Sequence, residues 1–214
     1  MSTLIFDFDG TLADSLPLIL KLFCELTNRP ILPDAEIERL RVLPTTQLIR
    51  ELKVPLWRVP VLLTKGRAAM AARMSEVPLF DGISEVLAQL ERDGHRMFIV
   101  SSNSVQNVEK FLKAHHLEHH FERVYGGAAL TGKAIILRKI MRQNHIDPSE
   151  AFYIGDEVRD VDGAEKVGLR TIAVAWGLSG EKALEVRKPY RLIRKANELP
   201  KMIPIDIEEE DRSE

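Results

Sequence analysis

The sequence predicts an α/β protein built on a doubly wound parallel sheet, with a small helical segment inserted into it. Beyond residue 82, short apolar runs alternate with helical patterns, which is typical of parallel strands joined by right-handed crossovers. A wholly apolar run at residues 4–6 indicates one more buried strand near the start of the chain. Residues 15–79, between these parts, show helical patterns only. We therefore expect a core of residues 1–14 and 80–204 and a helical insert at residues 15–79.

The composition narrows the functional classes. With 214 residues and 45% hydrophobic content, the chain can bury the core of one domain plus an insert. Its 30 basic and 32 acidic residues give a net charge of −2 without a basic stripe, so we expect no nucleic-acid partner. No apolar run approaches the roughly 18 residues of a membrane helix, and the single cysteine, Cys24, excludes an intramolecular disulfide framework. We predict a cytoplasmic protein, monomer or homodimer, with no membrane partner and a disordered acidic tail at residues 205–214.

The first strand and the insert come first in chain order. The strand at residues 4–6 is followed at once by two aspartates and a glycine. Ser15 can cap the first helix of the insert, and Pro17 suits the first turn of that helix. Prolines separate the later helices of the insert, which we expect at residues 34–43, 45–52 and 61–75.

The rest of the core alternates regularly. Apolar runs indicate strands at residues 97–100, 123–125, 152–154 and 171–175. Helical patterns indicate helices at residues 83–92, 105–115, 133–144 and 160–167. Weaker signals indicate a last strand at residues 190–193 and a last helix at residues 196–202. Because parallel strands end at the same edge of a sheet, any ligand is expected at that edge.

Asp7 and Asp9 stand just beyond the first strand. Side chains alternate along a strand, so the two carboxylates point the same way while Phe8 points into the core. Two like charges so close are costly unless a cation neutralises them or one carries a proton. Gly10 then allows a tight turn and a close approach of the backbone to a ligand. A D-x-D pattern is common by accident, but the strand before it and Gly10-Thr11 after it favour a functional site.

Hydroxyl, amide and ammonium groups follow two further strands. Ser101, Ser102 and Asn103 come directly after residues 97–100. Such side chains cap helices, and a helix N-terminus is itself an anion site, so both interpretations can hold. Lys133 opens the helix at residues 133–144. It offers a point charge for a bound phosphate, unless it is a solvated lysine of the first turn.

Three carboxylates, those of Asp156, Glu157 and Asp160, follow the strand at residues 152–154. Asp156 and Asp160 are four residues apart, so they can face one site if a helix begins between them. Asp160 also suits the first turn of that helix, where an acid complements the helix dipole. Asp156, next to Gly155 at the strand tip, has no such structural explanation.

Taken in chain order, these four strand ends resemble the haloacid dehalogenase-like hydrolase superfamily in its phosphatase branch, the branch of the phosphoglycolate phosphatases. The resemblance covers roughly residues 3–202. The first motif of the family, D-x-D-G-T, stands at residues 7–11, and the fourth, G-D-x-x-x-D, at residues 155–160. The second motif, Ser or Thr after an apolar strand, matches Ser101 best and Ser102 next, and the third is Lys133. The resemblance implies a Rossmann-like core with a helical cap.

The same resemblance implies a Mg²⁺-dependent phosphatase that works through an aspartyl-phosphate. Asp7 is then the nucleophile, and Asp9 protonates the leaving alcohol and later deprotonates the attacking water. Mg²⁺ is then bound by Asp7, Asp156 and the backbone carbonyl of Asp9, a set of oxygen ligands that suits this ion.

For substrate binding, the resemblance implies that the phosphoryl oxygens contact Ser101 or Ser102, Asn103 and Lys133. The choice between the two serines stays open. Asp160 positions either Lys133 or a water molecule beside the metal. Glu157 stands where the family often has Ser or Thr, so its role near the metal also stays open.

The insert matches the position of the family's helical cap, which closes over the site and sets the choice of substrate. The substrate implied is a small phosphorylated metabolite, phosphoglycolate-like or a sugar phosphate. Asp9 argues against the dehalogenase and phosphonate-cleaving branches, whereas a phosphomutase or a catalytically silent binding module with the same fold remains an alternative. An anionic substrate tail could be bound by cations of the insert that are otherwise solvated, namely Arg50, Lys53, Lys65, Arg67 and Arg73.

A histidine-rich run lies outside these motifs. His115, His116, His119 and His120 stand at spacings of four residues that can bind zinc. Histidines are also favoured at the C-terminus of a helix, where a positive charge complements the dipole. Both interpretations stay open at this point.

Overall fold

The structure is a computed structural model of the chain, and it describes residues 1–41, 43, 45–127 and 132–204. Its sheet has six strands in the order β3-β2-β1-β4-β5-β6, and neighbouring strands are parallel. The strands are β1 (Thr3–Phe6), β2 (Arg96–Val100), β3 (Arg123–Tyr125), β4 (Ala151–Gly155), β5 (Arg170–Val174) and β6 (Arg191–Ile193). The predicted α/β class and parallel sheet are confirmed. The predicted acidic tail, residues 205–214, lies outside the described residues.

The centre of the sheet is β1, all of whose residues are buried. Phe6, its last residue, lies opposite Ile99 of β2 on one side and Ile154 of β4 on the other. The strand order reverses direction at β1, and open α/β sheets bind their ligands at such a switch point. The residues just beyond β1, β2 and β4 therefore lie next to one another.

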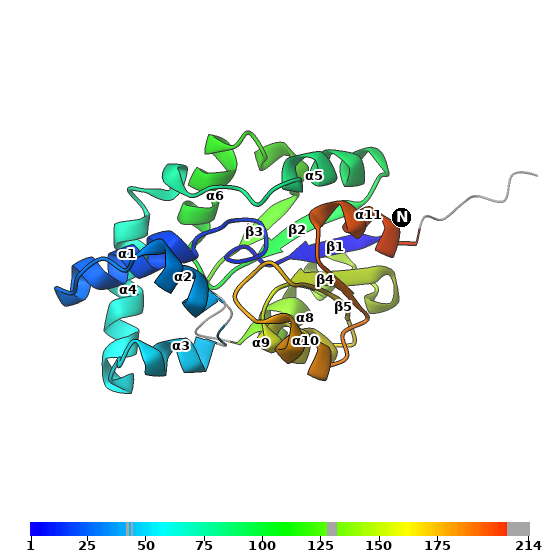
Figure 1. Cartoon of the computed structure of the whole chain (residues 1–214). Helices are drawn as coiled ribbons and strands as arrows, with labels where there is room; N and C mark the ends of the chain where they lie inside the picture. Colours follow the sequence, from blue (N-terminus) through cyan, green and yellow to red (C-terminus); the bar gives the residue numbers. More distant parts are fainter. Residues whose placement is uncertain (42, 44, 128–131, 205–214) are drawn as a thin grey trace, which may run out of the picture.

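Helices cover both faces of this sheet (Figure 1). One face packs against α5 (Ile83–Arg92), α6 (Val105–Ala114) and α11 (Leu199–Met202), and the other against α8 (Lys133–Asn144), α9 (Val158–Glu165) and α10 (Glu181–Val186). Alternation along β1 produces the two layers, because Leu4 and Phe6 pack with α5 and α6 while Ile5 packs with α8. The sheet is doubly wound, as predicted.

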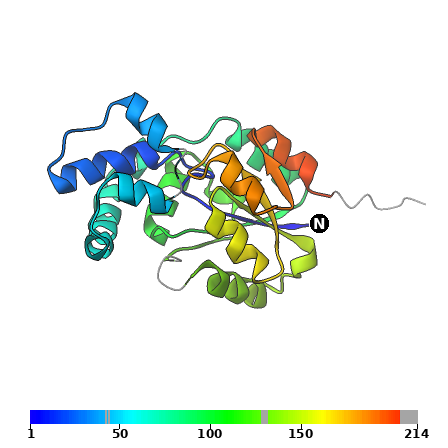
Figure 2. The same cartoon turned by 60° about the horizontal axis from the view of Figure 1, so that its bottom comes forward.

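Between β1 and α5, the described residues form the helices α1 (Leu16–Thr27), α2 (Asp34–Arg41), α3 (Thr45–Glu51) and α4 (Val59–Met70). Figures 1 and 2 both show these helices beyond the carboxyl end of β1. Leu16, Leu20 and Leu40 form the buried centre of this group, whereas Leu18 and Leu22 pack with the main core. The insert is therefore joined to the core through α1.

Some local predictions are wrong. The helix predicted at residues 61–75 begins at Val59 and ends at Met70, and a 3₁₀ turn follows at Met74–Glu76. Ser15 makes no capping hydrogen bond to α1. The sequence did not predict α10, because its six residues are too few to show a helical period. Within the described residues, no helix combines the length and the apolar character needed to cross a bilayer.

Candidate active site

Asp7 is the first residue beyond β1, and hydrogen bonds on both sides fix it there. Its backbone nitrogen donates to the Ile154 carbonyl at 2.8 Å, and its Oδ1 accepts from the Phe8 nitrogen at 2.8 Å. Phe8 is fully buried and packs edge-to-face on Phe111, with ring centroids 5.0 Å apart. The Asp7 carboxylate therefore stays at the carboxyl edge of the sheet while Phe8 anchors the turn in the core.

Lys133 joins two carboxylates that are far apart in the sequence. Its Nζ donates to Asp7 Oδ2 at 2.7 Å and also to Asp160 Oδ1. The Lys133 side chain is only 8% exposed. Burial acts to lower the pKa of Lys133, but the carboxylates of Asp160 and Asp7 raise it above the ordinary lysine value. Lys133 is therefore a buried, charged contact of Asp7 and not a solvated surface lysine.

Asp156 lies at the tip of β4 in a cradle of backbone and hydroxyl groups. Its Oδ1 accepts from Thr11 Oγ1 at 2.8 Å, and its Oδ2 accepts from the Leu178 nitrogen at 2.7 Å. Gly10 and Gly177 lie against this carboxyl group, and a Cβ added at either position would come 2.2 Å from an Asp156 atom. Both positions therefore need glycine for Asp156 to keep its place.

Asp160 lies in the first turn of α9, which begins at Val158, so a helix does begin between Asp156 and Asp160. Asp160 Oδ2 accepts from the Glu157 nitrogen at 3.1 Å, while Oδ1 contacts Lys133. Glu157 is 3% exposed, and its carboxylate accepts from Arg159. Asp160 thus caps the N-terminus of α9 and contacts Lys133 directly.

Asp7, Asp156 and Asp160 form a buried group in which one oxygen of each lies within 4.8 Å of the others. Burial raises the pKa of Asp7 to about 8, and Lys133 offsets only part of this effect. Burial, with Glu157 and Asp160 nearby, also raises the pKa of Asp156 well above its ordinary value. A divalent cation would favour the ionised carboxylates here, and an all-oxygen set of ligands suits Mg²⁺. The residues present therefore fit such an ion.

Asp9 faces the loop that follows β2. Its Oδ2 accepts from Asn103 Nδ2 at 3.3 Å, while its buried Oδ1 makes no hydrogen bond of normal geometry among the described residues. Burial raises the pKa of Asp9, and the nearby side chains of Ser15 and Asn103 act in the opposite direction. Ser15, which the sequence suggested as a helix cap, is therefore a neighbour of Asp9.

The two serines after β2 differ in their surroundings. Ser101 is fully buried, and its Oγ accepts from the Asn103 nitrogen at 2.9 Å. Ser102 is half-buried and lies with Asp9 and Asn103 in the wall of a cavity. Asn103 Oδ1 accepts from Asn107 Nδ2 at 2.9 Å, which leaves Asn103 Nδ2 to face Asp9. The structure thus places the residues of the four strand-end motifs at one edge of the sheet: Asp7, Asp9, Ser101, Ser102, Asn103, Lys133, Asp156, Glu157 and Asp160.

Comparison with known proteins decides the family. A model of the haloacid dehalogenase-like hydrolases matches residues 4–174. The chain belongs to this family. Phosphoglycolate phosphatase of Synechococcus elongatus is 32% identical over 203 residues, covering 93% of this chain and 95% of that protein. Pyrophosphatase PpaX of Bacillus cereus is 29% identical over 211 residues, covering 93% and 94%.

A solved structure supports the fold independently. The haloacid dehalogenase-like family protein of Streptococcus pneumoniae superposes with a TM-score of 0.77 at 20% identity, covering 94% of this chain and 97% of that chain. The hydrolase therefore shares both the family's sequence pattern and its fold. Its phosphatase relatives and the buried Asp7, Asp156 and Asp160 cluster are consistent with a phosphatase site.

In this hydrolase, replacing Gly10 by alanine is expected to displace Asp156 and destabilise the fold. The new methyl group would overlap Asp156 Oδ2, and Gly10 has a φ of +84°, a left-handed conformation that costs alanine about 1–2 kcal/mol. Urea denaturation should show that the free energy of unfolding falls by at least that amount. Gly66→Ala in α4 is the matched control, since a Cβ there meets nothing within 4 Å and alanine favours a helix interior by about 1 kcal/mol. Equal stability of the two variants would contradict this account of Gly10.

Tyr153→Phe is expected to stabilise the hydrolase. Tyr153 is fully buried beside Lys133, whose Nζ lies 5.1 Å from the centroid of the ring. Its hydroxyl has no hydrogen-bond partner within the described part of the chain. Removing an unsatisfied buried hydroxyl while keeping the ring should raise the free energy of unfolding by about 1 kcal/mol. A lower stability in urea denaturation would instead show that the hydroxyl is bonded in the folded protein.

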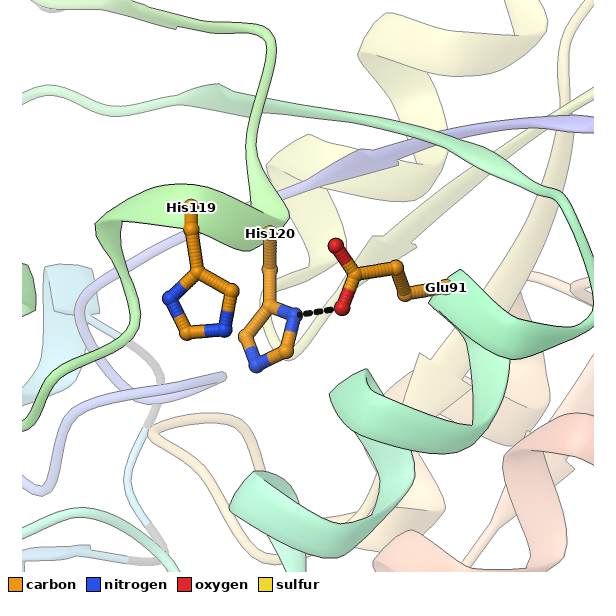
Figure 3. A group of neighbouring side chains, drawn as sticks. All are labelled: Glu91, His119 and His120. Atoms are coloured by element: carbon orange, nitrogen blue, oxygen red, sulfur yellow. Dashed lines mark hydrogen bonds and ion pairs between the residues drawn. The ribbon is translucent and has the colours of Figure 1, made fainter.

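The histidine-rich run forms a separate group, shown in Figure 3. His119 and His120 lie in a 3₁₀ turn (Glu118–His120), and His120 Nδ1 contacts Glu91 Oε2 of α5 at 2.8 Å. His115 Nε2 instead contacts the Val77 carbonyl at 2.9 Å. Within the described residues, the metal-compatible group that includes histidines is Glu91 with His119 and His120, and it contains neither of the pairs spaced by four residues. The His120 contact joins this turn to α5.

Proposed function

We propose that this hydrolase is a Mg²⁺-dependent phosphatase that cleaves a small phosphate monoester through an aspartyl-phosphate on Asp7. The observation that carries the proposal is the contact of Lys133 with both Asp7 and Asp160, beside Asp156, where β1 and β4 end. A phosphoryl group bound there would contact the ammonium group of Lys133. It would also lie beside the carboxylates that could hold Mg²⁺. Phosphoryl transfer depends mainly on such positioning and charge stabilisation.

In the proposed first step, a carboxylate oxygen of Asp7 attacks the phosphorus. The bond from phosphorus to the ester oxygen breaks, and its electron pair leaves with the alcohol. Asp9 gives that oxygen a proton, and burial supports this role because it raises the pKa of Asp9 and so favours the protonated acid.

In the second step, Asp9, now ionised, takes a proton from a water molecule whose oxygen attacks the phosphorus. The bond between Asp7 and phosphorus breaks, which restores the Asp7 carboxylate and the protonated Asp9. One ester and one water molecule thus yield one alcohol and one phosphate.

The remaining residues would bind and orient. Lys133, Asn103 and one of the two serines are proposed to contact the phosphoryl oxygens. The Ser101 hydroxyl accepts from a backbone nitrogen, so its own proton is available to donate, whereas Ser102 has the more open position. Mg²⁺ would be held by Asp7, Asp156 and the Asp9 carbonyl, and when bound it reduces the repulsion between carboxylate and phosphate.

Asp9→Asn tests the acid and base role. Because a general acid contributes about 10²–10⁴-fold, kcat for an alkyl phosphate should fall by that factor. For p-nitrophenyl phosphate, the rate of the first step should fall much less, because its leaving group needs no proton. Burst-phase kinetics separate the two steps, and an equal loss in the first step for both esters would contradict the role of Asp9.

The first experiment on function is phosphate release from a panel of small phosphate esters, with and without Mg²⁺. The relatives suggest phosphoglycolate and pyrophosphate as members of the panel, and sugar phosphates complete it. We expect release that depends on Mg²⁺. No release by the folded protein with Mg²⁺ present would favour a catalytically silent binding module. A cytoplasmic location, a monomer or homodimer, and a cap formed by residues 15–79 belong to the same proposal.

A further inference from the structure

A cavity of about 250 Å³ lies between the helices of the insert and the proposed catalytic residues. One end is formed by Asp9, Ser102 and Asn103, so it opens onto the phosphoryl-binding end of the site. The other walls come from α1, α3, α4 and the segment between α3 and α4. They are almost wholly aliphatic or aromatic and include Leu22, Phe23, Leu48, Leu52, Leu62 and Leu63.

Charge is scarce in this cavity. Arg67 is the one cation that the described residues place in its wall. The Arg67 carbonyl accepts from Asn107 Nδ2 at 3.0 Å, and Asn107 Nδ2 also contacts Asn103. These hydrogen bonds place the Arg67 backbone near Asn103, and apart from Arg67 the residues that line the cavity beyond Asp9, Ser102 and Asn103 are apolar.

The other cations of the insert, proposed from the sequence as contacts for an anionic substrate tail, lie elsewhere. Arg73 pairs with Glu25 and Glu76, and Arg50, Lys53 and Lys65 are absent from the cavity wall. Apart from Arg67, the cavity wall offers an anionic group on the alcohol no cationic partner, and burying an unpaired charge is very costly.

The size of the cavity and the exposure of two of its leucines also favour an apolar group. An engineered apolar cavity of about 150 Å³ holds benzene, so this one can hold a ring or a chain of several carbons. Leu26 and Leu63 remain 38% and 50% exposed although both line the cavity. An apolar group bound here would cover these side chains, which favours binding.

We propose that the substrate of this phosphatase is the phosphate ester of a small apolar alcohol, an aryl or short alkyl phosphate, whose carbon group occupies this cavity. The inference rests on the proposed function and names its substrate class. The bond that breaks is the P–O bond to that alcohol, which leaves with the proton from Asp9, and water is the only co-reactant.

Two matched pairs of esters test this proposal on the wild-type protein with Mg²⁺. Propyl phosphate and phosphoglycolate are similar in size but differ by a carboxylate, as do 4-isopropylphenyl phosphate and 4-carboxyphenyl phosphate. We expect kcat/KM to be higher for the uncharged member of each pair by about 10-fold or more. Faster turnover of the carboxylated members would overturn the inference and leave the phosphatase in place. No release from any of the four esters would count against the proposed function itself.

Gly66→Leu tests the location. Gly66 lines the cavity, and a Cβ at this position meets nothing within 4 Å, so a leucine can fill the space without a backbone clash. We expect kcat/KM for phenyl phosphate to fall by about 10-fold or more, with little change for methyl phosphate. Lys65→Leu is the control, because it adds a leucine to the same helix outside the cavity wall. An equal effect of Gly66→Leu on both esters, or an effect of Lys65→Leu as large, would overturn the proposal.

Discussion

Asp7→Asn is expected to reduce turnover by about 10⁴-fold or more, the usual effect of removing a nucleophile. The amide keeps the size of the side chain, and its oxygen can still accept from the Phe8 nitrogen. An amide cannot form the acyl phosphate, however, because its oxygen is a far weaker nucleophile than a carboxylate oxygen. Steady-state phosphate release, measured with Mg²⁺ and a saturating ester, gives the comparison.

Folding must be unaffected for this result to bear on catalysis. Lys133 keeps its contact with Asp160 in this variant, and urea denaturation must show that the variant is folded. Asp162→Asn is a matched control on α9, since the side-chain contact of Asp162 among the described residues is a partly exposed one with Arg187 at 3.5 Å. Turnover of Asp7→Asn close to that of the wild type would exclude Asp7 as the nucleophile.

Lys133→Met is expected to lower both stability and activity. Removing one partner of a buried ion pair typically costs about 3–5 kcal/mol, because it leaves charge buried without compensation, and Lys133 contacts both Asp7 and Asp160. If Lys133 contacts the phosphoryl group, kcat should also fall by about 10²–10³-fold. Urea denaturation and phosphate release measure the two effects. Lys139→Met, at an exposed position of α8, is the control and should leave both unchanged.

The stability deficit of Lys133→Met should depend on pH. Burial raises the pKa of Asp7 from 3.8 to about 8, so between these values the folded protein holds a proton that the unfolded chain has lost. The free energy of unfolding contributed by Asp7 therefore falls as pH rises through this window. Lys133 lowers this pKa, so without it the window extends to higher pH. The deficit should stay constant at lower pH and grow as pH rises above about 8 in the absence of metal, and no growth above pH 8 would contradict the coupling.

Much of the site could be predicted from the sequence because it is built on strand ends. Asp7, Asp156 and the residues after β2 each follow an apolar run, and parallel strands end at one edge of the sheet, so these residues were expected there. The spacing of Asp156 and Asp160 suits one site if a helix begins between them; the helix was predicted from residue 160, and it begins at Val158. These patterns involve residues that are close together in the chain, so a single sequence is enough to recognise them.

Contacts made by tertiary structure could not be predicted in this way. The Leu178 nitrogen donates to Asp156, but a backbone nitrogen gives no signal in the residue type. Ser15 suits a helix cap by its position, and only the folded turn brings it close to Asp9. The apolar walls of the cavity come from separate helices whose leucines have the pattern of an ordinary core. Their arrangement around an open space appears only in the structure.

The most direct test of the account is detection of the phosphoryl group on Asp7. We would mix the Asp9→Asn variant with Mg²⁺ and p-nitrophenyl phosphate, quench with acid, and map the peptides by mass spectrometry. Without the base of the second step, the intermediate should accumulate, so the account predicts one phosphoryl group on the peptide that contains Asp7. A double variant that also carries Asp7→Asn should show none. Release of p-nitrophenol without a phosphoryl group on that peptide would contradict covalent catalysis by Asp7.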